Sequence, residues 1–154
     1  MKFIAKHFSE LTPAELYEIL RARAEIFLLE QHIVEQDMDG VDYDCLHCFL
    51  WENGKAVGTL RAFYTDEAKT KVKIGRVVTL THGKGHGKLL MEGSLAAIQK
   101  KLPYKMLYVH AQTQAAGYYE RFGFSPVGEE FDEAGIPHIE MIYQPSSTDP
   151  MFIA

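Results

Sequence analysis

The sequence has few cysteines, no long apolar run and no excess of positive charge. Its two cysteines, Cys45 and Cys48, form one CxxC motif. A structural zinc site needs four ligands, and only His47 lies close by in the sequence. A thioredoxin-type motif would open a helix, whereas here apolar residues continue through positions 49–51 as in a strand. We therefore predict no metal site and no redox role, but small buried thiols in a reducing cytoplasm.

No segment approaches the roughly 18–20 apolar residues of a membrane-spanning helix. The first residues also lack the apolar stretch and cleavage site of a secretion signal. A formal net charge of −5 argues against nucleic acid as a partner, because nucleic acids are bound through basic surfaces. The 154 residues, 47% apolar and 24% charged, have the composition of one soluble globular domain spanning residues 1–154. We expect a cytoplasmic protein that binds neither membranes nor nucleic acid.

Hydrophobic periodicity and turn residues predict alternating strands and helices. Thr12-Pro13-Ala14-Glu15 is a capping box with proline at the first helical position, and the apolar spacing behind it predicts a helix over 13–30. Asn53-Gly54 between two apolar runs predicts a β-hairpin. The expected strands cover 2–8, 46–52, 55–65, 72–80, 106–111, 124–131 and 136–144, with further helices over 86–101 and before Gly123. This order predicts an α/β (α+β) fold with a mixed sheet and helices packed on it.

An acidic stretch, with carboxylates at positions 35, 37, 39, 42 and 44, follows the first expected helix. Its spacing resembles half of a calcium loop, but the twelfth position is Leu46, where a bidentate glutamate is needed. A strand also follows it in place of a second helix. Two interpretations stay open, namely a solvated connecting loop and a set of acids along the approach of a cationic substrate.

The stretch Ile74–Leu90 combines a buried strand, a glycine-rich turn and the start of a helix. Glycines stand at 83, 85 and 87, with Lys84 and Lys88 among them. Strand, glycine turn and helix together bring bare backbone N–H groups and a helix N-terminus to an anionic ligand.

Two common phosphate-binding motifs fail at individual positions of this turn. A Walker A loop needs a glycine at position 82 and Ser or Thr at 89, where the sequence has His82 and Leu89. A dinucleotide fingerprint needs GxGxxG and an acidic residue at the end of the next strand, which here ends in His110-Ala111.

Together with a later segment, the turn resembles the GNAT superfamily of acyl-CoA N-acyltransferases. The pyrophosphate loop of that superfamily reads Arg/Gln-x-x-Gly-x-Gly/Ala, which residues 82–87 (HGKGHG) match except for His82 in the first position. The later segment, Asn-x-x-Ala-x-x-x-Tyr followed by Gly-Phe, is matched by Gln112, Ala115, Tyr119, Gly123 and Phe124, with glutamine in place of asparagine. Two motifs in the right order are more specific than either alone. The segments RARAEIFLLEQ, IGRVVT and GIPHIEM further resemble the ElaA-like branch of the superfamily.

The resemblance implies a GNAT fold, with a splayed central sheet flanked by helices and acyl-CoA between the fourth and fifth strands. It implies transfer of an acetyl group from acetyl-CoA, as acyl-donor cosubstrate, to a primary amine on a small molecule or an exposed amino group, and it allows a homodimer. Backbone groups of 77–79 would hold the pantetheine arm, and those of 84–88 would bind the pyrophosphate. The residues expected at acetyl-CoA are Val77, Val78, Thr79, His82, Gly83, Lys84, Gly85, His86, Gly87, Lys88 and Gln112.

By the same resemblance, Tyr119 would protonate the leaving thiolate, which a phenol can do without being ionised at rest. Tyr118 is expected to be a core residue, because adjacent helical residues face different ways. The base that deprotonates the amine is sought among Glu30, His110, His138 and Glu140. His138 and Glu30 are our catalytic candidates, and a water relay is the alternative. A non-catalytic acyl-CoA sensor and an interaction domain with an empty turn are the competing functions.

Overall fold

The computed structural model describes residues 1–145, and residues 146–154 of the expected domain lie outside the described part. A seven-stranded sheet has the order β1-β2-β3-β4-β5-β7-β6. Among the described strands, β4 and β5 pair in parallel and all other neighbours are antiparallel. The predicted mixed sheet is therefore confirmed. The strands are β1 (Lys2–His7), β2 (Leu46–Glu52), β3 (Lys55–Tyr64), β4 (Lys71–Thr79), β5 (Met106–Gln112), β6 (Phe124–Glu133) and β7 (Ile136–Tyr143).

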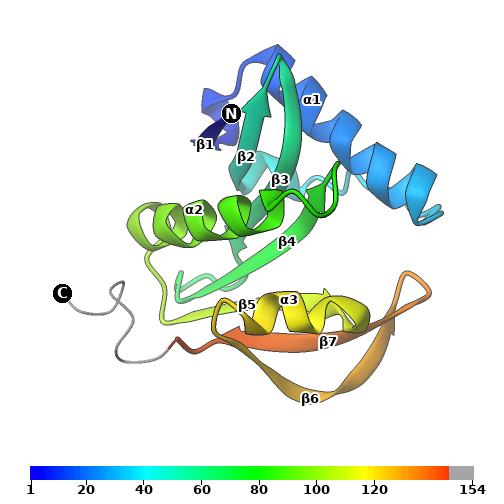
Figure 1. Ribbon diagram of the computed structural model, residues 1–154. Helices are drawn as coiled ribbons and strands as arrows, with labels where there is room; N and C mark the ends of the chain where they lie inside the picture. Colours follow the sequence, from blue (N-terminus) through cyan, green and yellow to red (C-terminus); the bar gives the residue numbers. More distant parts are fainter. Residues whose placement is uncertain (146–154) are drawn as a thin grey trace.

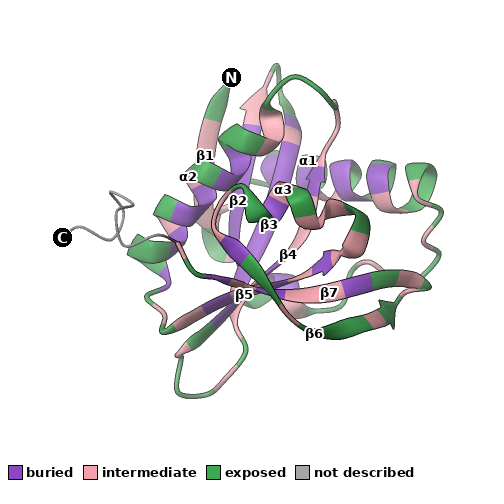
Figure 2. Cartoon of the chain, turned by 60° about the horizontal axis from the view of Figure 1, so that its bottom comes forward, coloured by how far each residue is buried: buried purple, intermediate pink, exposed green. Residues whose placement is uncertain are grey.

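Two helices cover opposite faces of the first half of the sheet (Figure 1). Ile19 of α1 (Pro13–Arg23) packs with Phe49 on one face. Ile98 of α2 (His86–Lys101) packs with Cys48 on the other. β2 is buried on both faces for this reason, which explains its continuous apolar run (Figure 2). No helix within residues 1–145 has the length and apolarity to cross a membrane.

The helix predicted over 13–30 has the right extent but changes type. α1 ends at Arg23, and a π-helix, η2 (Ala24–Glu30), continues it. The backbone N–H of Gln31 accordingly donates to the carbonyl of Ile26, five residues earlier, at 2.9 Å. π-helical turns are rare and often lie at functional sites.

The sheet splays between β4 and β5. Their ladder runs from Lys71↔Met106 to Ile74↔Val109, although β4 continues to Thr79 and β5 to Gln112. A bulge in β4, where Arg76 has φ +52°, bends the strand at this point. In Figure 1 the β5, β7 and β6 strands accordingly diverge from β2, β3 and β4. The gap expected between the fourth and fifth strands is confirmed.

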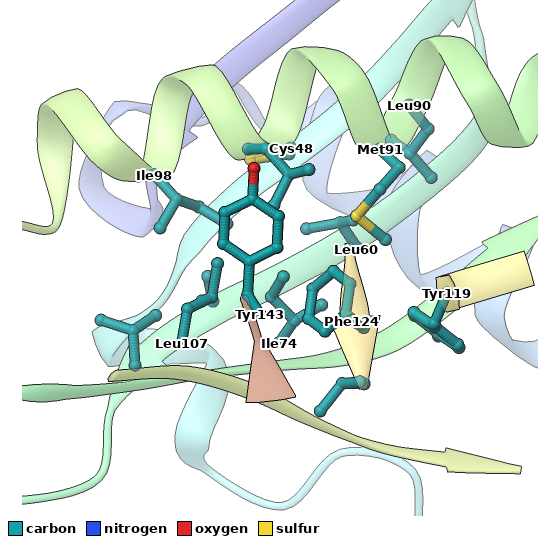
Figure 3. Packing of buried hydrophobic residues seen from close by; sticks show 14 of the residues in the cluster. Cys48, Leu60, Ile74, Leu90, Met91, Ile98, Leu107, Tyr119, Phe124 and Tyr143 are labelled. Atoms are coloured by element: carbon teal, nitrogen blue, oxygen red, sulfur yellow. The ribbon is translucent and has the colours of Figure 1, made fainter. Parts of the chain in front are cut away.

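Shorter elements complete the fold: η1 (Phe8–Glu10), η3 (Val41–Asp44), η4 (Thr113–Ala115) and α3 (Ala116–Glu120). The side chain of Tyr119 on α3 packs beside Phe124, in the same core cluster as Ile98 of α2 (Figure 3). The turn after α3 ends at Gly123, whose φ of +98° favours glycine.

The last hairpin differs from the prediction at its turn. The sequence pattern places Glu133 in a three-residue turn, whereas β6 extends through Glu133, which pairs with Ile136. The turn consists of Ala134 and Gly135, with φ values of +55° and +77°. Positive φ at both central residues is the type I′ conformation, whose twist matches that of the flanking strands. Glu133 is therefore held in a strand.

Candidate active site

A cavity of about 640 Å³ opens where β4 and β5 diverge. Its walls come from η2, the loop over 31–38, β4, β5 and the β6–β7 turn. Of the candidate residues, it brings together five: Val77, His110, Gln112, Tyr119 and His138. Glu30, Val78, Thr79 and residues 82–88 are not among its lining residues. The volume is in the range of small-molecule sites.

Tyr119 reaches the cavity from α3 and is otherwise enclosed, with 6% of its surface exposed. Its ring makes edge contacts with Tyr118 and Phe124, with centroids 5.0 and 5.7 Å away. Burial raises the pKa of Tyr119, and the neighbouring Tyr118 adds to the effect. The phenol therefore keeps its proton at neutral pH, as a proton donor must.

Tyr118 packs against the core, as predicted, and its hydroxyl also makes a hydrogen bond. Its hydroxyl donates a 2.7 Å hydrogen bond to the carbonyl of Gly87 in the first turn of α2. A Cβ atom at Gly87 would come within 3.0 Å of the Tyr118 ring. The third glycine of the turn thus permits α3 to approach the start of α2.

The glycine-rich turn has the geometry of an anion site. Gly83 and Gly85 have φ values of +79° and +75°, and Gly85 is the N-cap of α2. The first helical bond observed in α2 runs from the N–H of Leu89 to the carbonyl of Gly85, so the earlier N–H groups of the helix have no helical acceptor. Lys84 and Lys88 are exposed on the same segment. These donors and charges fit the pyrophosphate of an acyl-CoA.

Glu30 lies at this turn and not in the cavity. Its Oε1 atom is 3.4 Å from Nε2 of His82, and both side chains are exposed. Gln112 does line the cavity, where its amide donates to Oε1 of Gln31 at 2.9 Å. That bond ties the end of the π-helix to β5.

Two histidines and a glutamate form the β5–β7 side of the cavity. Nδ1 of His138 donates to the carbonyl of Ile136 at 2.7 Å, which leaves Nε2 as the basic nitrogen of the neutral ring. Nε2 of His110 lies 3.0 Å from Oε1 of Glu140. Glu133 stands between the rings, with one oxygen 3.5 Å from Nε2 of His138 and the other 3.7 Å from Nδ1 of His110.

Glu133 is the functional candidate that the sequence prediction missed. The acidic turn before Gly135 carries a signal for a hairpin but none for a site. In the β5–β7 ladder, His138 and Glu140 lie opposite Gln112 and His110. Strand pairing therefore gathers these groups from positions about 30 residues apart.

The acidic stretch contains an ion-pair network, so neither of the two interpretations left open describes Asp37, Asp39 and Asp42. Asp37, Asp39 and Asp42 bind three arginines of α1, β3 and β4. The contacts are Arg23–Asp37 (2.9 Å), Arg23–Asp42 (2.7 Å), Arg61–Asp39 (2.7 Å), Arg61–Asp42 (3.0 Å), Arg76–Asp37 (2.8 Å) and Arg76–Asp39 (3.4 Å). Steering of a cation by these three aspartates is ruled out because their charges are neutralised locally.

The network also explains how β4 keeps its bulge. A left-handed conformation at a non-glycine residue such as Arg76 costs about 1–2 kcal/mol. Its guanidinium pairs with Asp37 and also donates to the Asp37 carbonyl at 3.0 Å. These contacts offset the strain and fix the cavity wall beside the divergence of β4 and β5.

One group of potential metal ligands belongs to the same network. The ligand atoms of Asp42, Cys45 and His47 lie within 4.8 Å of one another. The Asp42 carboxylate already accepts from Arg23 and Arg61. Burial raises the pKa of the Cys45 thiol to about 12, which opposes the thiolate that a metal requires. We therefore assign these residues to the structural network.

Known proteins of similar sequence and structure agree with this geometry. A family model described as an acetyltransferase (GNAT) domain matches residues 13–145. Protein ElaA of Escherichia coli (strain K12) is 37% identical over 139 residues, covering 88% of this chain and 91% of ElaA. The crystal structure of Escherichia coli ElaA superposes with a TM-score of 0.85 at 35% identity, covering 93% of this chain and 99% of that one. An acyl-CoA N-acyltransferase from Pseudomonas aeruginosa superposes with a TM-score of 0.84 at 36% identity and the same coverage.

Proposed function

This chain belongs to the acetyltransferase (GNAT) family, and we propose that it transfers an acetyl group from acetyl-CoA to a primary amine by direct attack of the amine nitrogen. One observation carries the proposal. Two side chains line the same cavity at the open end of β4 and β5: the protonated phenol of Tyr119, and the imidazole of His138, whose Nε2 carries no proton in the neutral ring. These are the acid and the base that amide formation from a thioester requires.

The donor would bind along β4 and the turn that follows it. Beyond Ile74 the edge of β4 toward β5 has no ladder partner within the described residues, so its peptide groups can bond the pantetheine arm. The N–H groups of residues 84–88 would take the pyrophosphate, assisted by Lys84 and Lys88. Acetyl-CoA supplies the activated acyl group, and the chain supplies its orientation.

His138 is our candidate for the base. An aliphatic amine arrives as an ammonium ion and must lose a proton before it can attack. Nε2 of His138 can take that proton, because Nδ1 carries its own hydrogen to Ile136. The C–N bond then forms as the C–S bond breaks. Glu30 lies beside His82 on the glycine turn and outside the cavity, so we assign the base to His138 and not to Glu30.

Tyr119 is our candidate for the acid. It gives its proton to the departing thiolate and recovers one from the nitrogen of the new amide, so the phenol is regenerated. The net products are the amide, coenzyme A and one proton, which leaves through His138. We place the reaction in the cytoplasm, since both described cysteines are free and buried, as in reduced proteins.

The test combines calorimetry with acetyl-CoA and a thiol-release assay over a panel of amines. Tyr119→Phe should lower kcat by about 10²–10⁴-fold with an unchanged dissociation constant for acetyl-CoA. Tyr17→Phe, on the exposed side of α1, is the matched control and should behave as the parent protein. Binding without thiol release from any amine would identify a sensor. No binding at high micromolar acetyl-CoA would overturn the proposal as a whole.

A further inference from the structure

The chemistry of the acceptor can be read from the side chains that line the cavity. We propose that the acceptor is a primary amine attached to an apolar body, with its ammonium bound by Glu133 and its body along an apolar wall formed by η2 and the loop after it. This inference rests on the proposed transfer to an amine and specifies which amines are used.

Two carboxylates that line the cavity, Glu133 and Glu35, have no arginine partner among the described residues, and of these two Glu133 lies beside the imidazoles. Asp37, another acid of the lining, pairs with Arg23 and Arg76. The Glu133 side chain is 49% exposed and faces two imidazoles at 3.5 and 3.7 Å. An ammonium bound by its oxygens would therefore lie next to Nε2 of His138, the proposed base.

The other charged groups on this side favour a cation. Glu140 adds a second carboxylate through its contact with His110. Lys73 also lines the cavity, and burial lowers the pKa of its ammonium while Glu133 and Glu140 act to raise it. Arg61 and Arg76 also line the cavity, but their charges are paired with Asp39, Asp42 and Asp37. The carboxylates of Glu133 and Glu140 therefore exceed the one lysine where the amine must enter.

A second wall, formed by η2 and the loop over 31–38, carries a run of apolar side chains beside the polar Gln31, Glu35, Gln36 and Asp37 and is open to solvent. Leu28, Val34 and Met38 line the cavity although 46%, 86% and 56% of their surfaces are exposed. Phe27 and Ile33 continue the same wall, and the N–H of Ile33 bonds to the carbonyl of Phe27 at 2.8 Å. Apolar side chains gathered at a cavity mouth mark a surface that a ligand covers. The π-helix places Phe27 and Leu28 toward the cavity.

The experiment measures both binding and turnover for three ligands: 2-phenylethylamine, ethylamine and 2-phenylethanol. The first combines ammonium and apolar body, and each of the others lacks one of them. With the protein saturated by coenzyme A, calorimetry should show 2-phenylethylamine binding at least about tenfold more tightly than either. In the thiol-release assay, its kcat/KM should exceed that of ethylamine by a similar factor.

Variants assign the preference to the two walls. Glu133→Gln should raise KM for 2-phenylethylamine by about tenfold or more, whereas Glu130→Gln, on the same exposed strand but outside the cavity, should not. Leu28→Asn should remove the preference for the phenyl group. The control is Leu29→Asn, at the exposed neighbouring position, and this variant should keep the preference. Unchanged affinity for acetyl-CoA would show that each variant is folded.

The outcomes separate this inference from the function on which it rests. Equal binding and turnover of ethylamine and 2-phenylethylamine, or an unchanged KM in Glu133→Gln, would overturn the inference and leave the acetyltransferase intact. Absence of acetyl-CoA binding and of thiol release with every amine would overturn the proposed function. If 2-phenylethanol bound as tightly as 2-phenylethylamine, the proposed role of Glu133 in binding the ammonium would be contradicted, but the role of the apolar wall would not.

Discussion

Asp42 is the position where one substitution should test the ion-pair network most directly. Its carboxylate accepts three hydrogen bonds, from Nη1 and Nη2 of Arg23 at 2.7 and 3.1 Å and from Nη1 of Arg61 at 3.0 Å. Arg23 is 1% exposed and Arg61 is 4% exposed, so neither guanidinium can turn to water. Asp42→Asn keeps the size of the side chain and removes its charge.

The expected loss follows from what the substitution leaves unpaired. Removing one partner of a buried ion pair costs about 3–5 kcal/mol. The amide side chain still offers one carbonyl oxygen as an acceptor, and Arg23 retains Asp37, so we expect the lower end of this range, about 3 kcal/mol. For a chain of this length that free energy corresponds to a fall in Tm of roughly 6–12 °C.

Urea denaturation followed by far-ultraviolet circular dichroism measures the loss. The midpoint should fall with an unchanged m-value, and the difference from the parent should persist in about 0.5 M NaCl, because buried pairs are little screened. Asp44→Asn, exposed two residues along the chain, is the control and should stay within about 0.5 kcal/mol. A loss below about 1 kcal/mol for Asp42→Asn would show that the pairs behave as surface ion pairs, and the network argument would fail.

The same network sets a pH dependence. Burial acts to raise the pKa of Asp42, but hydrogen bonds from Arg23 and Arg61 outweigh it and hold the pKa below its ordinary value. Hydrogen bonds from Arg61 lower the pKa of Asp39. Below about pH 4 the unfolded chain therefore binds protons that the folded chain does not, so stability falls with pH there. The fall between pH 5 and pH 3 should be shallower in Asp42→Asn than in the parent.

Two further predictions concern the glycine turn and the cysteines. Gly85→Ala and Gly128→Ala replace glycines with the same φ of +75° and no neighbour within 4 Å, so each should cost about 1 kcal/mol of stability, but only the first should weaken acetyl-CoA binding in calorimetry. Burial raises the pKa of the Cys45 and Cys48 thiols to about 12, so a thiol reagent at pH 8 should modify neither until urea unfolds the protein.

The parts of the fold that the sequence predicted well depend on local signals. Capping residues and Pro13 start α1, and Asn53-Gly54 makes a hairpin turn with φ values of +51° and +75°. The helix expected over 86–101 has those bounds in the structure. The π-helix over 24–30 could not be predicted, because helix-forming residues with apolar spacing do not distinguish bonds to the fourth residue back from bonds to the fifth.

The ion-pair network left one trace in the sequence. Arg23 falls on the apolar face of the first helix, between Ile19 and Ile26, and a buried arginine requires carboxylates. Which carboxylates serve it could not be read, since they are 14 and 19 residues away in a loop with five acids. Only the folded loop decides that Asp37 and Asp42 turn inward.

Glu133 shows how a turn can determine the contents of a site formed elsewhere. In a three-residue turn its side chain would have no defined face, and the cavity would contain two histidines without a carboxylate between them. With the turn confined to Ala134 and Gly135, β6 gains its last residues, and Phe131 and Glu133 point to one face because they are two apart in a strand. Phe131 pairs with His138, so Glu133 lies beside the same imidazole. One residue inserted into the turn would shift the register and move Glu133 to the other face of the sheet. The acceptor specificity we propose therefore depends on residues 134 and 135 as much as on Glu133 itself.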